Sequence, residues 1–153
     1  FCFEPVNDNY ELLLENIKLN NITNIIPFNC AVSQNSSKVK IFLNDDQSSH
    51  SMFIPNSESI EVPSISVHDI FKENEIKKCD LLKLDCEGAE YDIIKSIELE
   101  HFEFINKIAI EYHFADSKPD LLEELIKKLK KSFNQITTRE LFSDIGFLFA
   151  KRK

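Results

Sequence analysis

The sequence predicts a single α/β domain built on a mainly parallel β-sheet. Short apolar segments typical of strands alternate with segments of helical periodicity along most of the chain. The last two strand-like segments flank a short turn containing Gly146, which predicts an antiparallel pair at the sheet edge. With 153 residues, 42% of them hydrophobic, the chain has the length and the apolar content of one domain. We therefore expect residues 1–153 to form one domain.

The expected elements follow one another in the order that an α/β sheet requires. Strand-like segments, recognised by apolar runs or by alternation, are residues 1–3, 24–33, 37–44, 59–67, 107–114, 134–142 and 146–153. Helical segments are residues 7–21, 68–74 and 117–133, while residues 80–97 join a strand to a helix. Asn7 or Asp8 is expected to cap the first helix and Ser117 the last. Between them, the polar, serine-rich residues 44–59 predict a long loop that could act as a lid.

Charge and hydropathy exclude two classes of partner. A net charge of −8 argues against a nucleic-acid backbone, because phosphate binding requires a concentrated basic surface. The basic run in residues 125–133 ends a helix with an acidic start, which suits the helix dipole without any ligand. No apolar stretch approaches the ~20 residues that cross a bilayer, and no basic segment followed by an apolar one opens the chain. The sequence predicts a cytoplasmic protein without membrane insertion.

The four cysteines predict neither a disulfide framework nor a zinc site. Cys2, Cys30, Cys79 and Cys86 form no CxxC pair, and three lie beside strand-like segments. A buried thiol there behaves as a small apolar group. We expect reduced structural thiols.

Acidic side chains follow three of the predicted strands, at the sheet edge where ligands of α/β proteins gather. Glu4 closes the first strand and precedes a helix, so its carboxylate could accept hydrogen bonds from two adjacent ribose hydroxyls. The competing interpretation is a solvated turn carboxylate. The second acidic strand end is Asp85 with Glu87, and the third is Glu111 with His113.

The segment KLDCEGAE, residues 83–90, places charge on a strand flanked by leucines. Period-two geometry puts Lys83, Asp85 and Glu87 on one side, so Lys83 should contact one of the two carboxylates. This arrangement predicts either a structural ion pair or a polar pocket at the strand tip. Gly88 would let the backbone turn sharply and a ligand approach closely.

His113 shares one side of an extended segment with Glu111, so two strand tips should converge as three acids and one imidazole. Such a cluster could orient a substrate hydroxyl and remove its proton, or hold a divalent cation through oxygen ligands. The remaining histidines are interpreted as structural or solvated, and they are His50, His68 and His101.

The chain resembles the FkbM-type S-adenosylmethionine-dependent methyltransferases from Phe3 to about His113. The segments that carry the resemblance, in order and spacing, are FEPVNDNYELLLENIKLNN, NCAVS, EVPSISVHDIF, LLKLDCEGAE and IAIEYH. It implies a Rossmann-like methyltransferase sheet, S-adenosylmethionine as cofactor, and O-methylation of a sugar, glycolipid or small-metabolite hydroxyl. A small-molecule or glycan acceptor is the implied partner.

The resemblance also implies roles for individual residues. Glu4 would bind the ribose hydroxyls, Cys30 and Ala31 would lie near the adenine, and Asp85 and Gly88 would meet the methionine end of the cofactor. The reaction centre would be lined by Asp85, Glu87, Glu111 and His113, with Glu111 or His113 as base. Residues 48–55, with Met52 and Phe53, are expected to contact the acceptor.

One feature of the family is missing from the sequence. Methyltransferases of this fold carry a glycine-rich turn after their first strand, and neither Gly88 nor Gly146 lies in such a turn. We therefore expect an N-terminally truncated domain whose absent strand would lie between those ending at Glu4 and at Asp85. Those two strands would then pair directly, or chains would form a homodimer through the exposed edges.

Three functional classes follow from the sequence. The first is an O-methyltransferase domain, incomplete as given; the second is a metal-dependent hydrolase that uses the carboxylate cluster; the third is a non-catalytic remnant that binds partners. The methyltransferase interpretation explains Glu4 and KLDCEGAE together. The hydrolase needs no ribose carboxylate, and the remnant accounts best for the missing glycine-rich turn.

Overall fold

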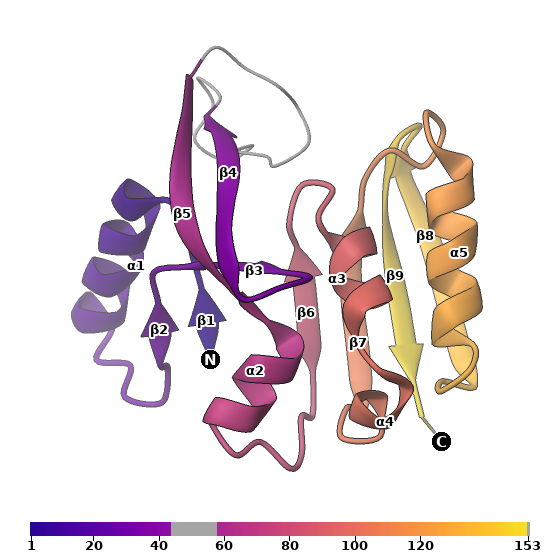
Figure 1. Ribbon diagram of the computed structural model, residues 1–153, viewed down its shortest axis with the longest axis horizontal. Helices are drawn as coiled ribbons and strands as arrows, with labels where there is room; N and C mark the ends of the chain where they lie inside the picture. The colour runs from indigo at the N-terminus through magenta and orange to yellow at the C-terminus, as the bar shows by residue number, and fades with distance from the viewer. Residues whose placement is uncertain (44–57, 153) are drawn as a thin grey trace. The chain divides into compact units, whose positions relative to one another are not determined.

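A computed structural model describes residues 1–43 and 58–152 of this mixed α/β protein (Figure 1). The chain divides into two compact units, Phe1–Ser66 and Val67–Lys153. Within the described residues the strands form three small sheets. The predicted loop contacts at residues 48–55 lie outside the described residues.

The Phe1–Ser66 unit contains two sheets and one helix. Its elements are β1 (Cys2–Phe3), α1 (Asn7–Leu19), β2 (Pro27–Phe28), β3 (Ala31–Ser33), β4 (Ser37–Leu43) and β5 (Glu58–Ser66). The strands β1 and β2 are parallel, while β5 lies between β3, which is parallel to it, and β4, which is antiparallel. A small core of Val6, Ala31, Ile41 and Val62 supports this unit.

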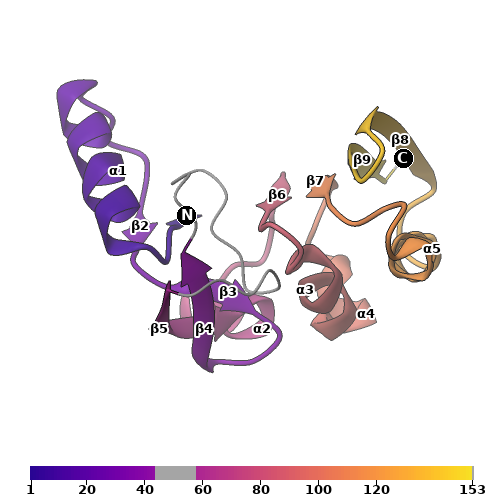
Figure 2. The same ribbon diagram turned by 90° about the horizontal axis from the view of Figure 1, so that it is seen from above.

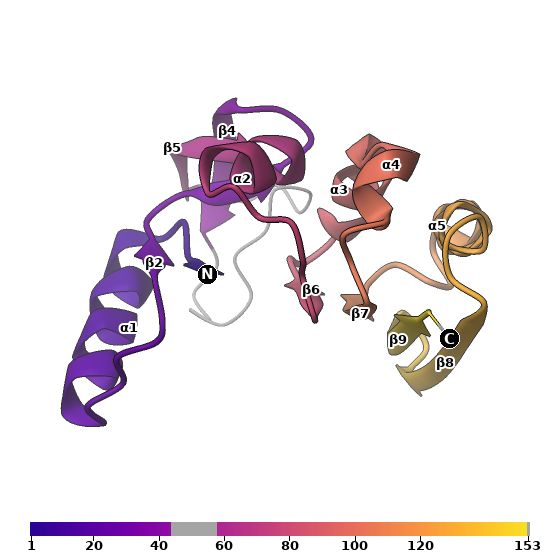
Figure 3. The same cartoon turned by 90° about the horizontal axis from the view of Figure 1, so that it is seen from below.

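The Val67–Lys153 unit is a four-stranded sheet with helices. Its elements are α2 (Val67–Glu73), β6 (Leu82–Asp85), α3 (Glu90–Ser96), α4 (Leu99–Phe102), β7 (Lys107–Tyr112), α5 (Pro119–Leu129), β8 (Gln135–Phe142) and β9 (Ile145–Lys151). The strand order is β6-β7-β9-β8, with β6 and β7 parallel and the other two pairs antiparallel. Figures 2 and 3 show α3, α4 and α5 on one face of this sheet.

The core of this unit lies between that face and the helices. Alternation along β7 buries Ile108, Ile110 and Tyr112, as expected for a strand with one face covered. On α3, Ile93 and Ile94 follow the buried Glu90 by three and four residues, the spacing that places side chains on one face of a helix, and both are buried. Other side chains without measurable exposure are Phe102, Ile105, Leu129 and Leu148. These contacts hold the carboxyl ends of β6 and β7 in fixed positions.

Most predicted elements are confirmed, including the antiparallel pair β8–β9 at the end of the chain. The expectation of one mainly parallel sheet is wrong for the described residues, because β4 pairs antiparallel with β5 and β9 inserts antiparallel between β7 and β8. The short helix α4 was not predicted, and it contains His101.

Both predicted helix caps are wrong. The N-cap of α1 is Val6 and that of α5 is Lys118, and neither makes a side-chain cap hydrogen bond. Before α5, the backbone N–H groups of Asp116 and Ser117 instead donate to Oδ1 of Asp144, at 2.9 and 2.8 Å. A carboxylate from the β8–β9 turn therefore binds the backbone of the two residues that precede the N-cap of α5.

Several expectations concern edges, thiols and membranes. Among the described residues, β1 pairs with β2 alone and β6 with β7 alone; the proposed homodimer stays a prediction. Cys2, Cys30 and Cys79 are free, as is Cys86, which agrees with the expected reduced thiols. None of the described helices is long and apolar enough to cross a membrane.

Candidate functional site

The predicted convergence of acids and imidazole at the tips of β6 and β7 is confirmed. The parallel register places Asp85 opposite Glu111, and His113 is the first residue after the end of β7. Asp85, Glu111 and His113 each offer one metal-ligand atom within 4.8 Å of the others. Oε2 of Glu87 lies 3.4 Å from Nε2 of His113. We call Asp85, Glu87, Glu90, Glu111 and His113 the strand-tip cluster.

The turn that joins β6 to α3 depends on two residues with left-handed backbone. Glu87 has φ of 49° and Gly88 has φ of 108°, the second a region that residues with a Cβ rarely adopt. The N–H of Ala89 then donates to the carbonyl of Cys86 at 3.1 Å, and α3 starts at Glu90. The sharp turn predicted for Gly88 is confirmed.

Glu90 is the member of the cluster that sequence reasoning missed. It has no exposed surface, yet its side chain is a carboxylate. Its Oε2 accepts the backbone N–H of Gly88 at 2.8 Å, and its Oε1 accepts the backbone N–H of His113 at 2.9 Å. The sequence held one indication that Glu90 is buried. Ile93 and Ile94 follow it by three and four residues, which places it on the apolar face of α3.

The imidazole of His113 lies between two carboxylates. Its Nδ1 is 3.2 Å from Oε1 of Glu90, and its Nε2 faces Glu87. The hydroxyl of Tyr91 donates to the backbone carbonyl of His113, which fixes the end of β7 against α3. Only 7% of the His113 side chain is exposed, compared with 28% for Glu87. Glu87 is therefore the more accessible group of this pair.

Burial and neighbouring charge shift the titration of both groups. Burial alone lowers the pKa of His113, but the hydrogen bond and charge of Glu90, with the charges of Glu87 and Glu111, raise it above its ordinary value. Burial raises the pKa of Glu87, while the charge of His113 opposes that rise. The charge of each group therefore acts on the titration of the other.

The predicted contact of Lys83 with a strand-tip carboxylate is confirmed for Asp85. Nζ of Lys83 lies 2.8 Å from Oδ2 of Asp85, and 65% and 41% of the two side chains are exposed. An ion pair this exposed contributes about 0.2–1 kcal/mol, too little to determine the turn.

Nearby, burial raises the pKa of Cys86 to about 12, so its thiol stays protonated and is no nucleophile.

The residues predicted to bind the ribose and the adenine of the cofactor lie in the Phe1–Ser66 unit. Glu4 follows β1 and is half-buried, and its Oε1 accepts the backbone N–H of Val6 at 2.8 Å. Nδ2 of Asn29 donates to the backbone carbonyl of Glu4 at 3.0 Å. Cys30 precedes β3 and burial raises its thiol pKa, whereas Ala31 is buried in the core. Their cofactor roles stay predictions.

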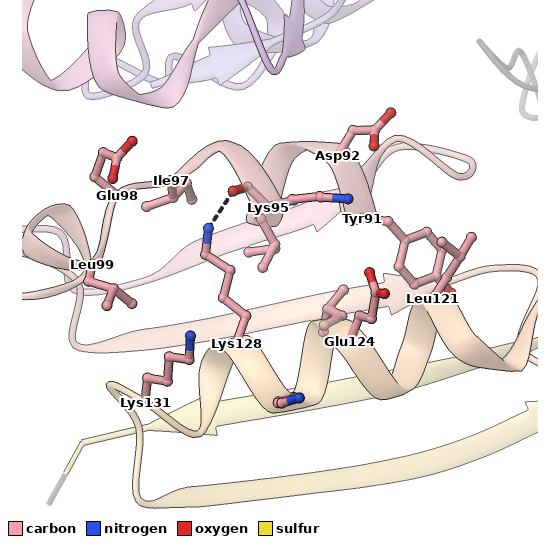
Figure 4. Close-up of a pocket in the computed structure, with 13 residues that line it drawn as sticks. Tyr91, Asp92, Lys95, Ile97, Glu98, Leu99, Leu121, Glu124, Lys128 and Lys131 are labelled. Carbon is pink, nitrogen blue, oxygen red and sulfur yellow. Dashed lines mark hydrogen bonds between the residues drawn. The ribbon is translucent and has the colours of Figure 1, made fainter.

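A groove between α3 and α5 is a concave feature of the Val67–Lys153 unit (Figure 4). Its volume is about 380 Å³. Its charged lining consists of three acids and four lysines. The acids are Asp92, Glu98 and Glu124, and the lysines are Lys95, Lys127, Lys128 and Lys131. Nζ of Lys128 donates to the carbonyl of Lys95 near the end of α3. We call this surface the α3–α5 groove. Its nearly equal numbers of acids and lysines are typical of the boundary between two packed helices.

The sequence of the chain matches a known protein family. The family described as Methyltransferase FkbM domain matches residues 1–138. The chain belongs to the FkbM methyltransferase family. This family implies a Rossmann-like fold and the use of S-adenosylmethionine. Its members are enzymes that transfer methyl groups.

Distant relatives of this FkbM-family chain are also methyltransferases. Hexuronic acid methyltransferase AglP of Haloferax volcanii is 25% identical over 153 residues, covering 100% of this chain and 62% of the relative. Methyltransferase 1 of Beauveria bassiana is 21% identical over 141 residues, covering 78% of this chain and 56% of the relative. Methyltransferase sdnD of Sordaria araneosa is 20% identical over 143 residues, covering 72% and 55%.

The FkbM-family chain spans little more than half the length of the curated relatives it matches, between 55% and 62%. No solved structure shows a significant match. The strand-tip cluster falls inside residues 1–138, the part that matches the family.

Proposed function

We propose that this protein is an S-adenosylmethionine-dependent O-methyltransferase that acts on the hydroxyl of a sugar, glycolipid or other small metabolite. The observation that carries the proposal is the strand-tip cluster, a set of carboxylates around a buried imidazole within a chain of the FkbM family. Such a cluster suits proton removal from a hydroxyl, the protein's part in O-methylation.

The side chains present fit the cofactor that the family implies. When bound, S-adenosylmethionine supplies an activated methyl group on a positively charged sulfur. The carboxylates of Asp85, Glu87 and Glu111 provide negative charge that complements a cation. Glu4, at the end of a parallel strand, is the carboxylate proposed for the ribose hydroxyls.

The protein's own chemistry would centre on the pair of Glu87 and His113. Glu87 is accessible enough to accept a hydrogen bond from the acceptor hydroxyl, and Nε2 of His113 lies 3.4 Å from its Oε2. The hydroxyl proton would pass to this pair and then to solvent, while the acceptor oxygen is held in line for transfer. Of the two bases considered from sequence, His113 has this second carboxylate contact, so we assign it the role.

A sugar acceptor is the substrate class that one of the relatives favours. AglP is a methyltransferase of hexuronic acid, and its match covers the whole chain. A hydroxyl of an acidic sugar is therefore the first acceptor to test.

The experiment follows methyl transfer and cofactor binding separately. Calorimetric titration of S-adenosylhomocysteine into this chain and into the protein encoded by the full gene measures cofactor binding. Release of S-adenosylhomocysteine in the presence of free and lipid-linked hexuronic acids, neutral sugars and small alcohols then measures transfer. We expect binding and transfer with the full-length protein. Absence of cofactor binding by that protein would overturn the proposal.

A metal requirement is tested in the same assay. Asp85, Glu111 and His113 are close enough to hold a cation, the feature on which the hydrolase interpretation depended. We expect transfer to continue in EDTA, because a hydroxyl needs only a base and an aligned methyl group. Loss of transfer in EDTA, restored by Mg²⁺, Mn²⁺ or Zn²⁺, would instead assign this group as metal ligands.

A further inference from the structure

Glu90 is unusual because a fully buried carboxylate occupies a helix face that otherwise carries apolar side chains. Its neighbours on that face, Ile93 and Ile94, have no exposed surface. A buried charge destabilises a fold unless hydrogen bonds compensate it, and a leucine there would avoid that cost. The carboxylate therefore has a role beyond filling space.

The contacts of Glu90 define that role. Its Oε2 accepts the N–H of Gly88, the residue with φ of 108° in the turn after β6. Its Oε1 accepts the backbone N–H of His113 and faces Nδ1 of the same residue at 3.2 Å. One carboxylate thus joins the tip of β6 to the tip of β7 and contacts the imidazole between them.

The geometry also favours one imidazole tautomer. Both oxygens of Glu90 accept backbone N–H groups, so Nδ1 of His113, which faces Oε1, is the nitrogen expected to carry a hydrogen. Nε2 is then the nitrogen that gains and loses a proton, and it lies 3.4 Å from Oε2 of Glu87. This is how buried carboxylates orient catalytic imidazoles in general.

We propose that Glu90 is a positioning residue for methyl transfer, which holds His113 with hydrogen on Nδ1 and leaves Nε2 beside Glu87 as proton acceptor. This inference rests on the proposed methyltransferase function and adds a residue to that site. The step it supports moves one proton, from the acceptor hydroxyl to the Glu87–His113 pair, and the pair returns the proton to solvent after transfer.

Carboxylates from every neighbouring element face His113. They are Asp85 at the end of β6, Glu87 in the turn, Glu90 on α3 and Glu111 on β7. Glu90 is the one that hydrogen-bonds the ring and has no exposed surface. Neutralising it should therefore weaken the proton affinity of the imidazole more than neutralising a solvated carboxylate.

The first measurement is NMR of ¹⁵N-histidine protein, which requires no substrate. The chain has four histidines, and loss of one signal in His113→Gln assigns His113. We expect the neutral ring to carry hydrogen on Nδ1, and its pKa to fall by about one unit in Glu90→Gln. Asp92→Asn, in the first turn of the same helix, is the matched control and should leave both unchanged.

The second measurement is the pH dependence of kcat/KM for methyl transfer. In wild-type protein the rate should rise as pH passes through the pKa of His113. In Glu90→Gln this acid limb should move down by about one unit, and the plateau should fall about tenfold because a weaker base remains. A purely structural role would lower the rate at every pH without moving the limb. Glu90→Asp, which retains the charge, should restore the limb.

The outcomes separate this inference from the proposed function. A wild-type His113 with hydrogen on Nε2 overturns the role of Glu90 even if Glu90→Gln does not fold. An unchanged His113 pKa in Glu90→Gln, or an unmoved acid limb in an active enzyme, also overturns it. Absence of methyl transfer with every acceptor, together with the expected NMR result, counts against the proposed function and removes the catalytic part of the inference.

Discussion

The strand-tip cluster and the α3–α5 groove both gather charged side chains in the Val67–Lys153 unit, but they hold them differently. In the strand-tip cluster a carboxylate without exposed surface accepts two backbone N–H groups and contacts an imidazole. In the groove most lysines and acids are exposed, and a hydrogen bond from the Lys128 side chain to the carbonyl of Lys95 crosses from α5 to α3.

This difference shows that a hollow surface and a set of fixed reactive groups are separate features of this unit. The groove is a hollow of about 380 Å³, yet most of its charged side chains are exposed and contribute little to stability. The cluster has its reactive groups fixed by burial and by bonds to the backbone, the condition that positions a catalytic proton acceptor. Substitutions in the cluster should therefore change stability and titration strongly, and those in the groove weakly.

The largest effect is expected for Glu90→Leu. The change leaves the N–H groups of Gly88 and His113, and the ring Nδ1, without their acceptor. We expect the free energy of unfolding in urea to fall by about 3 kcal/mol. Glu124→Leu, an exposed position in the groove, is the control and should change it by less than about 0.5 kcal/mol. Equal effects at the two positions would remove the distinction between cluster and groove.

The next effect concerns the support of β7. Gly146 on β9 lies opposite Tyr112, the last residue of β7, and a Cβ at Gly146 would overlap the Tyr112 ring and lie 2.7 Å from the carbonyl of Arg139. Gly146→Ala should lower the free energy of unfolding by about 2 kcal/mol and shift the NMR signals of the adjacent His113. Gly146 lies in β9 and not in the hairpin turn where the sequence placed it. Ser143→Ala, in the turn between β8 and β9, should do neither.

A smaller effect is expected from the titration of His113. Because its pKa in the folded state lies above 6.5, folding gains stability from the protonated ring. That contribution is complete below pH 6.5 and is lost as pH rises through the raised pKa. Urea unfolding between pH 6 and 8.5 should show this loss in wild-type protein and in Glu124→Gln, and a flatter profile in His113→Gln. A steeper loss in His113→Gln would contradict the sign of the shift.

The sequence predicted the part of the cluster that follows from local geometry. Residues two apart on a strand share a side, and parallel neighbouring strands end at one edge, so Asp85, Glu111 and His113 had to converge once β6 and β7 were adjacent. The positive φ of Gly88 followed from its place between strand and helix.

Glu90 could not be assigned in the same way, because its partners are backbone groups brought together by folding. Residues 88 and 113 are far apart in sequence, and nothing in either segment indicates a shared carboxylate. Its position on the apolar face of α3 was the one local clue. Most buried charges become intelligible only when their hydrogen-bond partners are known.

The sheet pairing and the helix caps were also beyond local reasoning. Alternating strands and helices indicate an α/β fold, but the antiparallel pairing of β4 with β5 depends on contacts between segments. Before α5, the backbone N–H of Ser117 donates to Asp144 in the β8–β9 turn, a tertiary contact that the local sequence did not indicate, and the N-cap is Lys118.

The smallest effect is expected in the groove, for Lys128→Met. Burial lowers the pKa of Lys128, which reduces the stabilisation from its charge, although the ammonium bonds the carbonyl of Lys95 and lies 6.0 Å from the Phe102 ring. Methionine keeps the length and apolar contacts of the side chain, so unfolding free energy should fall by less than about 1 kcal/mol. Lys131→Met, at the same end of α5, should have no measurable effect. A loss as large as that of Glu90→Leu would mean that the groove, too, fixes its charges through the fold.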